Sequence, residues 1–144
     1  MPSFTNQIAN LTQVGPIAEV LVGPSQALAK ALQVKGSAVP QPIRVTAMVD
    51  TGASSTVITP SVVQALGVQP VGVQQMSTPS TQQPVVVHQY DVSLHFPNGV
   101  TVHGARALEA PLGGQHIQCL IGRDVLQHGV LIYIGYARQF TLSF

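Results

Sequence analysis

Cysteine, charge and aromatic side chains are all scarce in this chain of 144 residues. A single cysteine cannot form an internal disulfide, which excludes a small secreted scaffold held together by disulfides. Charged residues make up only 8% of the chain, and a net charge of +1 offers no electrostatic attraction for nucleic acid or an anionic membrane surface. Because 45% of the residues are hydrophobic, the composition also excludes an intrinsically disordered chain.

Long hydrophobic runs are missing as well. The run from Val130 to Ile134 is among the longest, and it is far too short to span a membrane. The segment from Met1 to Gln7 has neither the basic start nor the apolar stretch of a signal peptide. We therefore expect a soluble, cytoplasmic protein with no membrane or nucleic-acid partner, and a length that fits one domain.

Abundant valine and closely spaced turn residues favour an all-β fold with one or two short helices. Residues 1–16 are polar and aperiodic, which predicts an N-terminal arm, mobile or loosely attached, before a domain over residues 17–144. Strands are predicted at 17–22, 43–49, 90–96, 100–103, 118–121, 131–134 and 140–144.

Two segments carry helix signals. Ser25 is a candidate N-cap for a helix over residues 26–33, although Gly23-Pro24-Ser25 is equally compatible with a hairpin. The second helix is predicted to start at Thr59-Pro60, with Thr59 as N-cap, and to end at Gly67.

Asp50 stands apart among the five carboxylates, because an apolar strand over residues 43–49 leads directly into Asp50-Thr51-Gly52. A charged group at the end of a buried strand is costly unless hydrogen bonds or a function compensate. Gly52 permits close approach of the backbone, and its N–H can donate to a carboxylate. The tripeptide alone is equally compatible with an ordinary Asx turn.

Two longer segments resemble the signatures of retropepsin-like aspartic proteases. Val49–Ile58, with the Asp-Thr-Gly-Ala sequence, resembles the catalytic loop, and Leu120–Leu126 resembles the hydrophobic–Gly–Arg–Asp segment near the end of the domain. The strand with Gln89-Tyr90-Asp91 resembles the strand that follows the flap in this family, so the match runs from about Ile43 to Phe144.

The resemblance implies a single-lobe acid-protease fold, which is a closed, barrel-like β-domain that forms a two-fold dimer. It implies that Asp50 is catalytic, that Thr51, Gly52 and Ala53 support it, and that Gly122, Arg123 and Asp124 form a structural motif. The chain has only one Asp-Thr-Gly, so an Asp dyad requires Asp50 from each chain of a homodimer. The expected function is an aspartic endopeptidase with peptide or protein substrates. The alternative is a catalytically silent member used for dimerisation or peptide binding.

The other carboxylates of the second half fit structural roles. Asp91 lies in the middle of a predicted strand, on its polar face, and is expected to be solvated. Asp124 is predicted to cap a helical turn over residues 125–128.

The sequence departs from the family pattern in two places. Many retroviral members have Asp at the position of Ser54, where it pairs with the arginine that corresponds to Arg123, whereas Ser54 has no charge. Family flaps are often rich in glycine or carry an aromatic residue, but residues 74–83 contain neither. The substrate cover is nevertheless expected here, with these residues in it: Met76, Thr78, Pro79 and Ser80.

Other chemistries find little support. The sequence around Ser54 is not a Gly-x-Ser-x-Gly nucleophile elbow. The five histidines have no metal-ligand spacing, and Cys119 fits a small buried residue beside Leu120. We expect neither a metal nor a cofactor.

Overall fold

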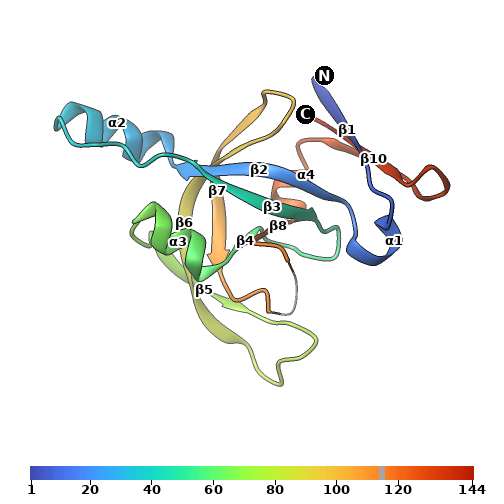
Figure 1. Cartoon of the computed structure of the whole chain (residues 1–144). Coiled ribbons are helices and arrows are strands. Elements are labelled where there is room, and N and C mark those ends of the chain that lie inside the picture. Colours follow the sequence, from blue (N-terminus) through green and yellow to red (C-terminus); the bar gives the residue numbers. More distant parts are fainter. Residues whose placement is uncertain (114–115) are drawn as a thin grey trace.

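The computed structural model describes residues 1–113 and 116–144, and it has a predominantly β fold with short helices, as predicted (Figure 1). In chain order the elements are β1 (Ser3–Gln7), α1 (Leu11–Val14), β2 (Ile17–Pro24), α2 (Gln26–Val34), β3 (Ile43–Val49), β4 (Val57–Ile58), α3 (Pro60–Leu66), β5 (Gly72–Met76), β6 (Val85–His95), β7 (Thr101–Glu109), β8 (Cys119–Ile121), α4 (Arg123–Leu126), β9 (Val130–Ile134), the 3-10 turn η1 (Gly135–Ala137) and β10 (Gln139–Ser143).

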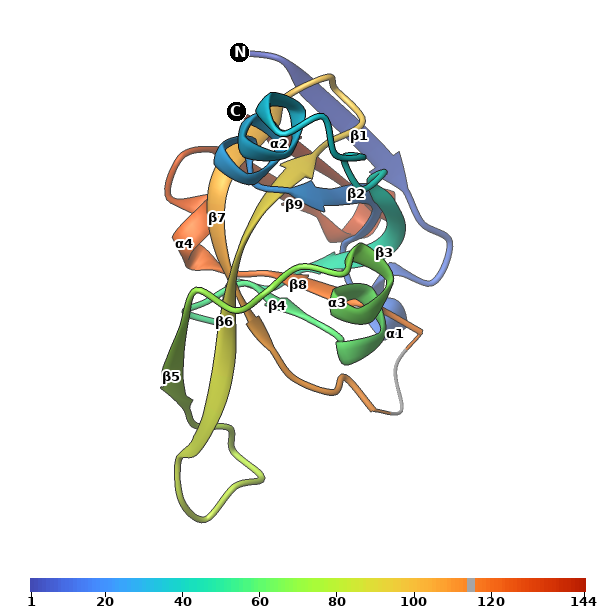
Figure 2. The same cartoon turned by 90° about the vertical axis from the view of Figure 1, so that its left-hand side faces the viewer.

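The larger sheet closes on itself. Its strand order is β2-β3-β8-β4-β7-β6-β5, and β2 also pairs with β6, so that six strands form a ring and β5 lies outside it. The β3–β8 and β4–β7 pairings are parallel, while the others in this sheet are antiparallel. As a result β5 and the adjoining half of β6 form a hairpin that extends away from the barrel (Figures 1 and 2).

Alternation of side chains builds the core. In β3 the buried residues are Val45, Ala47 and Val49, while Arg44 is exposed. Side chains of successive residues point to opposite faces of a strand, so the apolar residues at every second position line one interior. The same interior receives Leu66 from α3, which packs against β2 and β3.

A second, three-stranded sheet has the order β1-β10-β9 and is joined to the barrel by aromatic contacts. All four phenylalanines of the chain meet there. Phe96 of the β6–β7 turn lies 4.8 Å from Phe144 and 6.4 Å from Phe4, measured between ring centroids. Phe4 in turn makes an edge contact of 6.0 Å with Phe140.

Residues 1–16, for which the sequence predicts an arm, contain β1 and α1. β1 pairs antiparallel with β10, and Leu11 of α1 is buried in the core. Only Phe4 and Asn6 of β1 are even partly buried, so the segment carries little of the apolar alternation by which a strand is detected in sequence.

Both predicted helices form. The Ser25 hydroxyl caps α2 by accepting a hydrogen bond from the Leu28 N–H (3.1 Å), and α2 projects from the body of the molecule (Figure 1). Gly67 ends α3 in the left-handed conformation (φ 64°). Thr59 precedes α3 as predicted, but its hydroxyl bonds to the Ser61 hydroxyl (2.9 Å) rather than to the helix backbone.

β6 departs from the regular alternation that its sequence predicts. Val92, Ser93 and Leu94 are all buried, because the register with β7 shifts between Val92 and Leu94. Such a bulge turns side chains at consecutive positions toward the same side. Among the described residues no helix is long and apolar enough to cross a membrane.

Candidate active site

Asp50 follows the last residue of β3 and lies, half-buried, at the start of a tight turn. Its backbone N–H donates to the Ile121 carbonyl of β8 (3.0 Å), which fixes the position of the residue against the neighbouring strand. Its Oδ1 accepts a hydrogen bond from the Gly52 N–H (2.8 Å). A Cβ on Gly52 would lie 3.0 Å from the same oxygen, so a glycine lets the turn close over the carboxylate without crowding.

The chain from Thr51 to Ser54 is held by the segment that follows β8. The Arg123 N–H donates to the Ala53 carbonyl (2.9 Å), and the Asp124 N–H donates to the Ser54 carbonyl (3.3 Å). The Arg123 guanidinium donates to the Thr51 carbonyl (2.7 Å). The backbone of the loop thus provides the anchor for Arg123 in a chain that has a serine, not an aspartate, at position 54.

Gly122 allows these two segments to approach closely. A Cβ at this position would lie 2.5 Å from the carbonyl carbon of Ser55 and 2.6 Å from its oxygen. Distances this short are incompatible with any side chain, because the obstructing atoms belong to the backbone. Gly122 is therefore a steric requirement of the site.

Asp124 has a different role from the predicted one. The helical turn α4 is Arg123–Leu126 rather than 125–128, and its N-cap position is taken by Gly122. The Asp124 carboxylate accepts from the Thr56 hydroxyl (2.9 Å) and the Thr56 N–H (3.0 Å), as well as from the Val125 N–H (3.0 Å). Asp124 thus links α4 to the strand that leaves the Asp50 loop. The carboxylate therefore bonds Thr56, which is far away in sequence, and does not act as the N-cap of the helical turn.

Thr56 is the residue that sequence reasoning missed. Its side chain is fully buried, and its hydroxyl both donates to Asp124 and accepts from the Gly122 N–H (3.1 Å). A lone threonine between the Ser54-Ser55 pair and an apolar strand carries no sequence signal of such a role.

The remaining carboxylates all have side-chain partners. Glu19 pairs with Arg44 (2.9 Å), and Asp91, expected to be solvated, is half-buried and lies 3.6 Å from Arg106. Within residues 1–113 and 116–144, Asp50 is the one carboxylate bound only by a backbone N–H of its own turn.

Glu109 accepts a hydrogen bond from the Tyr90 hydroxyl (2.9 Å). Burial, followed by the hydrogen bond to Glu109 and the negative charge of that residue, together raise the pKa of Tyr90 to about 12. Tyr90 is therefore a neutral hydrogen-bond donor at physiological pH.

Cys119 is fully buried, as predicted, and burial together with the charge of Asp124 raises the pKa of its thiol to about 12. A thiol that stays protonated is a poor nucleophile. In the part of the chain that the structure describes, no three His, Cys, Asp or Glu side chains are grouped closely enough to hold a metal ion.

An apolar cluster lies between the loop and the hairpin. Its buried members come from β4, β7 and the residue after β7, and partly buried side chains from the hairpin, the loop after β7 and β8 pack on them; the set is Val57, Leu108, Ala110, Met76, Val87, Leu112 and Leu120. Val57 and Leu120 are paired strand neighbours; Val57 follows the Asp50 loop, and Leu120 lies two residues before Gly122. The cluster therefore extends from the base of the loop to the inner face of the hairpin.

The predicted flap residues divide into two groups. Met76 ends β5, a strand that the sequence does not predict, and belongs to the apolar cluster. Thr78, Pro79 and Ser80 belong to the connection between β5 and β6, where the Thr78 N–H donates to the Thr81 hydroxyl (2.9 Å) in a local turn. The structure thus brings one of the four predicted residues into contact with the cluster.

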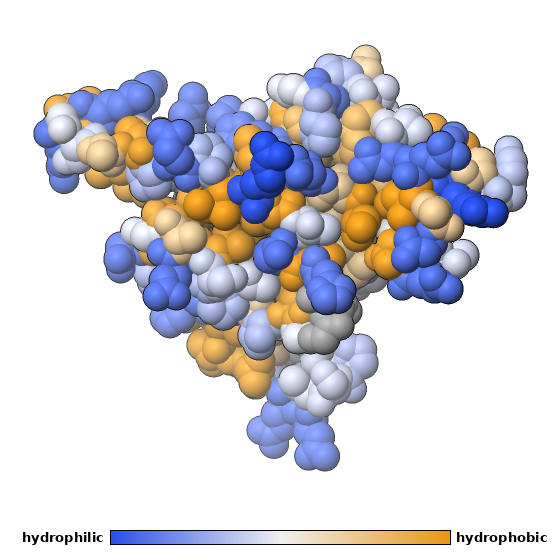
Figure 3. Space-filling view, viewed as in Figure 1, coloured by the Kyte–Doolittle hydropathy of each residue, from blue (hydrophilic) through white to orange (hydrophobic). Residues whose placement is uncertain are grey.

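Apolar side chains also gather on the outside of the hairpin (Figure 3). The exposed valines there are Val71, Val73 and Val86, with 56–67% of their surface exposed, whereas Val85 pairs with Met76 and shares the inner face. The hairpin has no charged side chain, so neither of its faces repels an apolar or backbone contact electrostatically.

Comparison with known proteins identifies relatives of this fold. A family model described as aspartyl protease matches residues 25–125. The structure is similar to a retropepsin-like aspartic protease from Rickettsia conorii, with a TM-score of 0.59, 14% identity and coverage of 99% of this chain and 90% of the other. It is also similar to the EIAV protease in complex with the inhibitor HBY-793, with a TM-score of 0.53, 20% identity and coverage of 84% and 92%. No protein with curated annotation matches the sequence.

Proposed function

The chain belongs to the aspartyl protease family, and from this we propose that it is an endopeptidase whose active site contains Asp50 from each of two identical chains. The observation that supports the proposal is the hydrogen bonding of the Asp50 carboxylate and of the turn that bears it. Asp50 has the only side-chain carboxylate in the described residues without a side-chain partner, and it lies in a turn that Arg123 and Asp124 anchor through hydrogen bonds to its carbonyl groups.

One chain supplies one such turn, so a second copy is needed for a pair of carboxylates. Two carboxyl groups about 3 Å apart share one proton, because they cannot both be ionised at that distance. The ionised member activates a water for attack on the peptide carbonyl, and the protonated member donates to the developing oxyanion. Thr51, Gly52 and Ala53 support this chemistry by holding the turn that bears Asp50.

The proposed substrate is an extended peptide with apolar side chains on either side of the scissile bond. Such side chains would enter the apolar cluster at Val57 and Leu120, while Met76 contacts them from the hairpin. Methionine suits such a position because its flexible side chain adapts to different shapes. A cytoplasmic location remains a prediction from the sequence.

Replacement of Asp50 tests the proposal. Asp50→Asn retains the shape of the side chain but removes the charge and the exchangeable proton, so cleavage of a peptide library should fall to background. Far-UV circular dichroism and sedimentation should be unchanged, with a mass of twice the 15.1 kDa chain. Asp91→Asn, which alters a carboxylate on a different strand, is the matched control and should retain cleavage.

Three results would contradict the proposal. Full activity in Asp50→Asn would remove the residue from the mechanism. A strictly monomeric wild-type protein that cleaves peptides would exclude the two-chain dyad. A dimeric wild-type protein that binds a statine-type peptide analogue but cleaves nothing would favour the catalytically silent peptide-binding module.

A further inference from the structure

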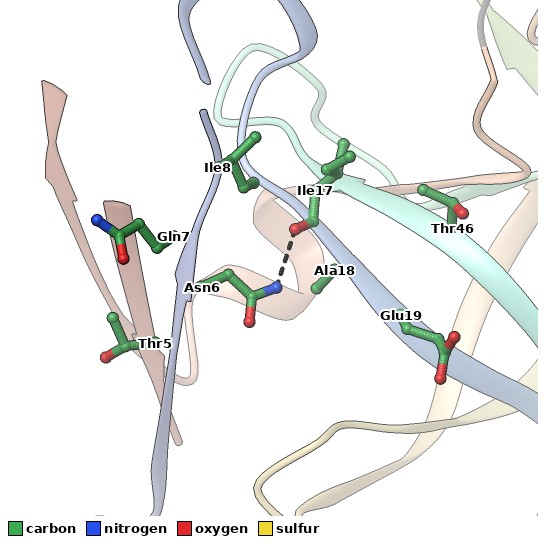
Figure 4. A pocket seen from close by; sticks show the side chains of 8 residues that line it. All are labelled: Thr5, Asn6, Gln7, Ile8, Ile17, Ala18, Glu19 and Thr46. Atoms are coloured by element: carbon green, nitrogen blue, oxygen red, sulfur yellow. Dashed lines mark hydrogen bonds between the residues drawn. The ribbon is translucent and has the colours of Figure 1, made fainter. Parts of the chain in front are cut away.

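A slot of about 370 Å³ lies between β1 and the start of β2, on the side of the molecule where the small sheet meets the barrel (Figure 4). At one end the slot is bridged by the Asn6 side-chain amide, which donates to the Ile17 carbonyl (3.1 Å). From this contact the two strands diverge, as Figure 4 shows, so the slot widens toward Thr5 and Glu19.

The β1 side of the slot is a free strand edge. The Ile8 N–H donates to the Arg138 carbonyl and the Pro2 carbonyl accepts from the Phe144 N–H, so the even-numbered residues of this strand face β10. Backbone groups of an antiparallel strand alternate between its two edges, so the N–H and C=O groups of Thr5 and Gln7 face the other way. Within the described residues no hydrogen bond to these four groups is present.

The β2 side of the slot is also open. The Val49 N–H donates to the Pro16 carbonyl, so the even-numbered residues of β2 face β3 and Glu19 faces away from it. β2 pairs with β6 only from Leu21 onward, and therefore the backbone groups of Glu19 have no strand beside them. The slot is thus lined on both sides by unused backbone donors and acceptors.

We propose that this slot binds an extended, unstructured peptide segment of another protein, which pairs with the free edges of β1 and β2. An exposed edge with unpaired N–H and C=O groups is a template for an added strand. The occupant must have both of its own edges free, because it lies between two strands. A strand that is already part of a sheet, including β1 or β9 of a second copy, therefore does not fit.

The side chains around the slot indicate the chemistry of the segment. Ile8, Ile17 and the buried Ala18 provide an apolar floor, which favours a small or β-branched apolar residue pointing inward. Thr46 offers a hydroxyl group at one wall, whereas the Thr5 hydroxyl is already bonded to that of Thr141 (2.7 Å). The Glu19 carboxylate at the mouth is neutralised by Arg44. An uncharged segment with alternating polar and apolar residues matches this lining.

The proposal is tested with a capped, fluorescein-labelled pentapeptide of alternating threonine and valine. In wild-type protein, saturating peptide should slow hydrogen exchange of the Thr5, Gln7 and Glu19 amides at least about tenfold, because they become hydrogen-bonded. The same peptide methylated on every backbone nitrogen should bind at least about tenfold more weakly, because it has no N–H to donate.

Two variants of β1 localise the effect. Thr5→Pro removes an N–H that faces the slot and leaves the groups that bond β10 intact, since proline is tolerated on a strand edge. It should weaken peptide binding about tenfold, by loss of that bond and by steric exclusion. Ser3→Pro makes the same change on the same edge outside the slot, and Thr5→Val removes only the hydroxyl; both should bind like the wild type.

Several results would overturn the proposal. No protection of the Thr5, Gln7 and Glu19 amides at millimolar peptide would exclude a strand in the slot. Protection confined to the hairpin or to the loop at Asp50 would show that the peptide binds only at the candidate active site. Protection of the Thr5 and Gln7 amides that increases with protein concentration, without peptide, would mean that a second copy occupies the slot.

Discussion

Two segments border the same apolar cluster but are built in opposite ways: the candidate catalytic loop at residues 50–56 and the hairpin at residues 72–87. The loop is anchored by backbone and side-chain hydrogen bonds to Gly122, Arg123 and Asp124, and Thr56 at its end is fully buried. The hairpin is mostly exposed, has no charged residue and contacts the cluster through Met76 and Val87. Catalytic geometry must be fixed before the substrate arrives, whereas a cover must adapt to it.

The largest expected effect comes from a methyl group placed inside the anchored region. Gly122→Ala puts a Cβ where the backbone of Ser55 already lies, so the loop must move. We expect the free energy of unfolding to fall by about 3 kcal/mol or more, and peptide cleavage to be lost. Urea unfolding measures the first effect. Gly113→Ala, whose added Cβ meets no atom within 4 Å, is the control and should be nearly neutral.

Thr56→Val preserves shape but removes the hydroxyl that joins Asp124 to Gly122. The Asp124 carboxylate and the Gly122 N–H each lose a partner in a buried site, and we expect destabilisation of about 2–4 kcal/mol. Thr59→Val, which removes an exposed hydroxyl bonded only to Ser61, is the matched control. Equal stability of the two variants would show that the loop is not held by this network.

Met76→Ala tests the other half of the comparison. Truncation of this side chain removes apolar contact with a bound peptide but leaves the loop untouched, so KM should increase about three- to tenfold with little change in kcat. The free energy of unfolding should change by less than about 1 kcal/mol, because the side chain is only half-buried. Val73→Ala, on the exposed outer face of the same strand, is the control. A drop in kcat alone would mean that the hairpin positions the reacting groups.

The smallest expected effect is a change in the loss of stability at acidic pH. It arises outside the Asp50 loop and the hairpin, since neither contains a histidine. Burial, and then the nearby charge of His103, lower the pKa of His95 below its usual 6.5. Unfolded protein therefore binds more protons at this residue, so the stability it contributes is present above about pH 6.5 and is lost as the pH falls below that value.

Chemical denaturation of His95→Gln at about pH 7.5 and about pH 5 measures this contribution. The loss of stability between the two conditions should be smaller than in the wild type. His88→Gln, an exposed histidine on the same strand, is the control. An identical loss in His95→Gln and wild type would assign the acid sensitivity to other groups.

Features that depend on residues close in sequence could be predicted, whereas features that depend on residues far apart in sequence could not. The strand before Asp50, the Ser25 cap of α2, the end of α3 at Gly67 and the terminal hairpin depend on neighbouring residues and form as expected. The predicted cap of α3 by the Thr59 side chain does not form. The anchor of Arg123 on the Thr51 carbonyl and the contact of Asp124 with Thr56 join residues 72 and 68 positions apart. The local sequence predicts that Asp124 caps a helical turn. Only the folded chain shows that its carboxylate bonds the buried Thr56 hydroxyl instead.

The pairing of β1 with β10 was beyond prediction for the same reason. β1 is recognisable as a strand only from its partner, because Phe4 is its single large apolar residue that faces the core. The hairpin at β5 shows the opposite case. Its sequence predicts no strand, but a strand forms because β6 offers a complete antiparallel register, from Gly72–Gln89 to Met76–Val85.

The distance in sequence between the two halves of the anchored loop sets the order of events during synthesis. Asp50 and Gly52 leave the ribosome about 70 residues ahead of Ile121 and Arg123, on which their geometry depends. At translation rates of roughly 5–20 residues per second, this gap lasts several seconds. The parallel pairing of β3 with β8 has to wait as well. A nascent chain that already contains the Asp-Thr-Gly sequence therefore has no assembled site, because the partners of its turn have not yet been synthesised. During that time, segments of the same chain or of neighbouring nascent chains cannot meet a fully formed Asp50 turn.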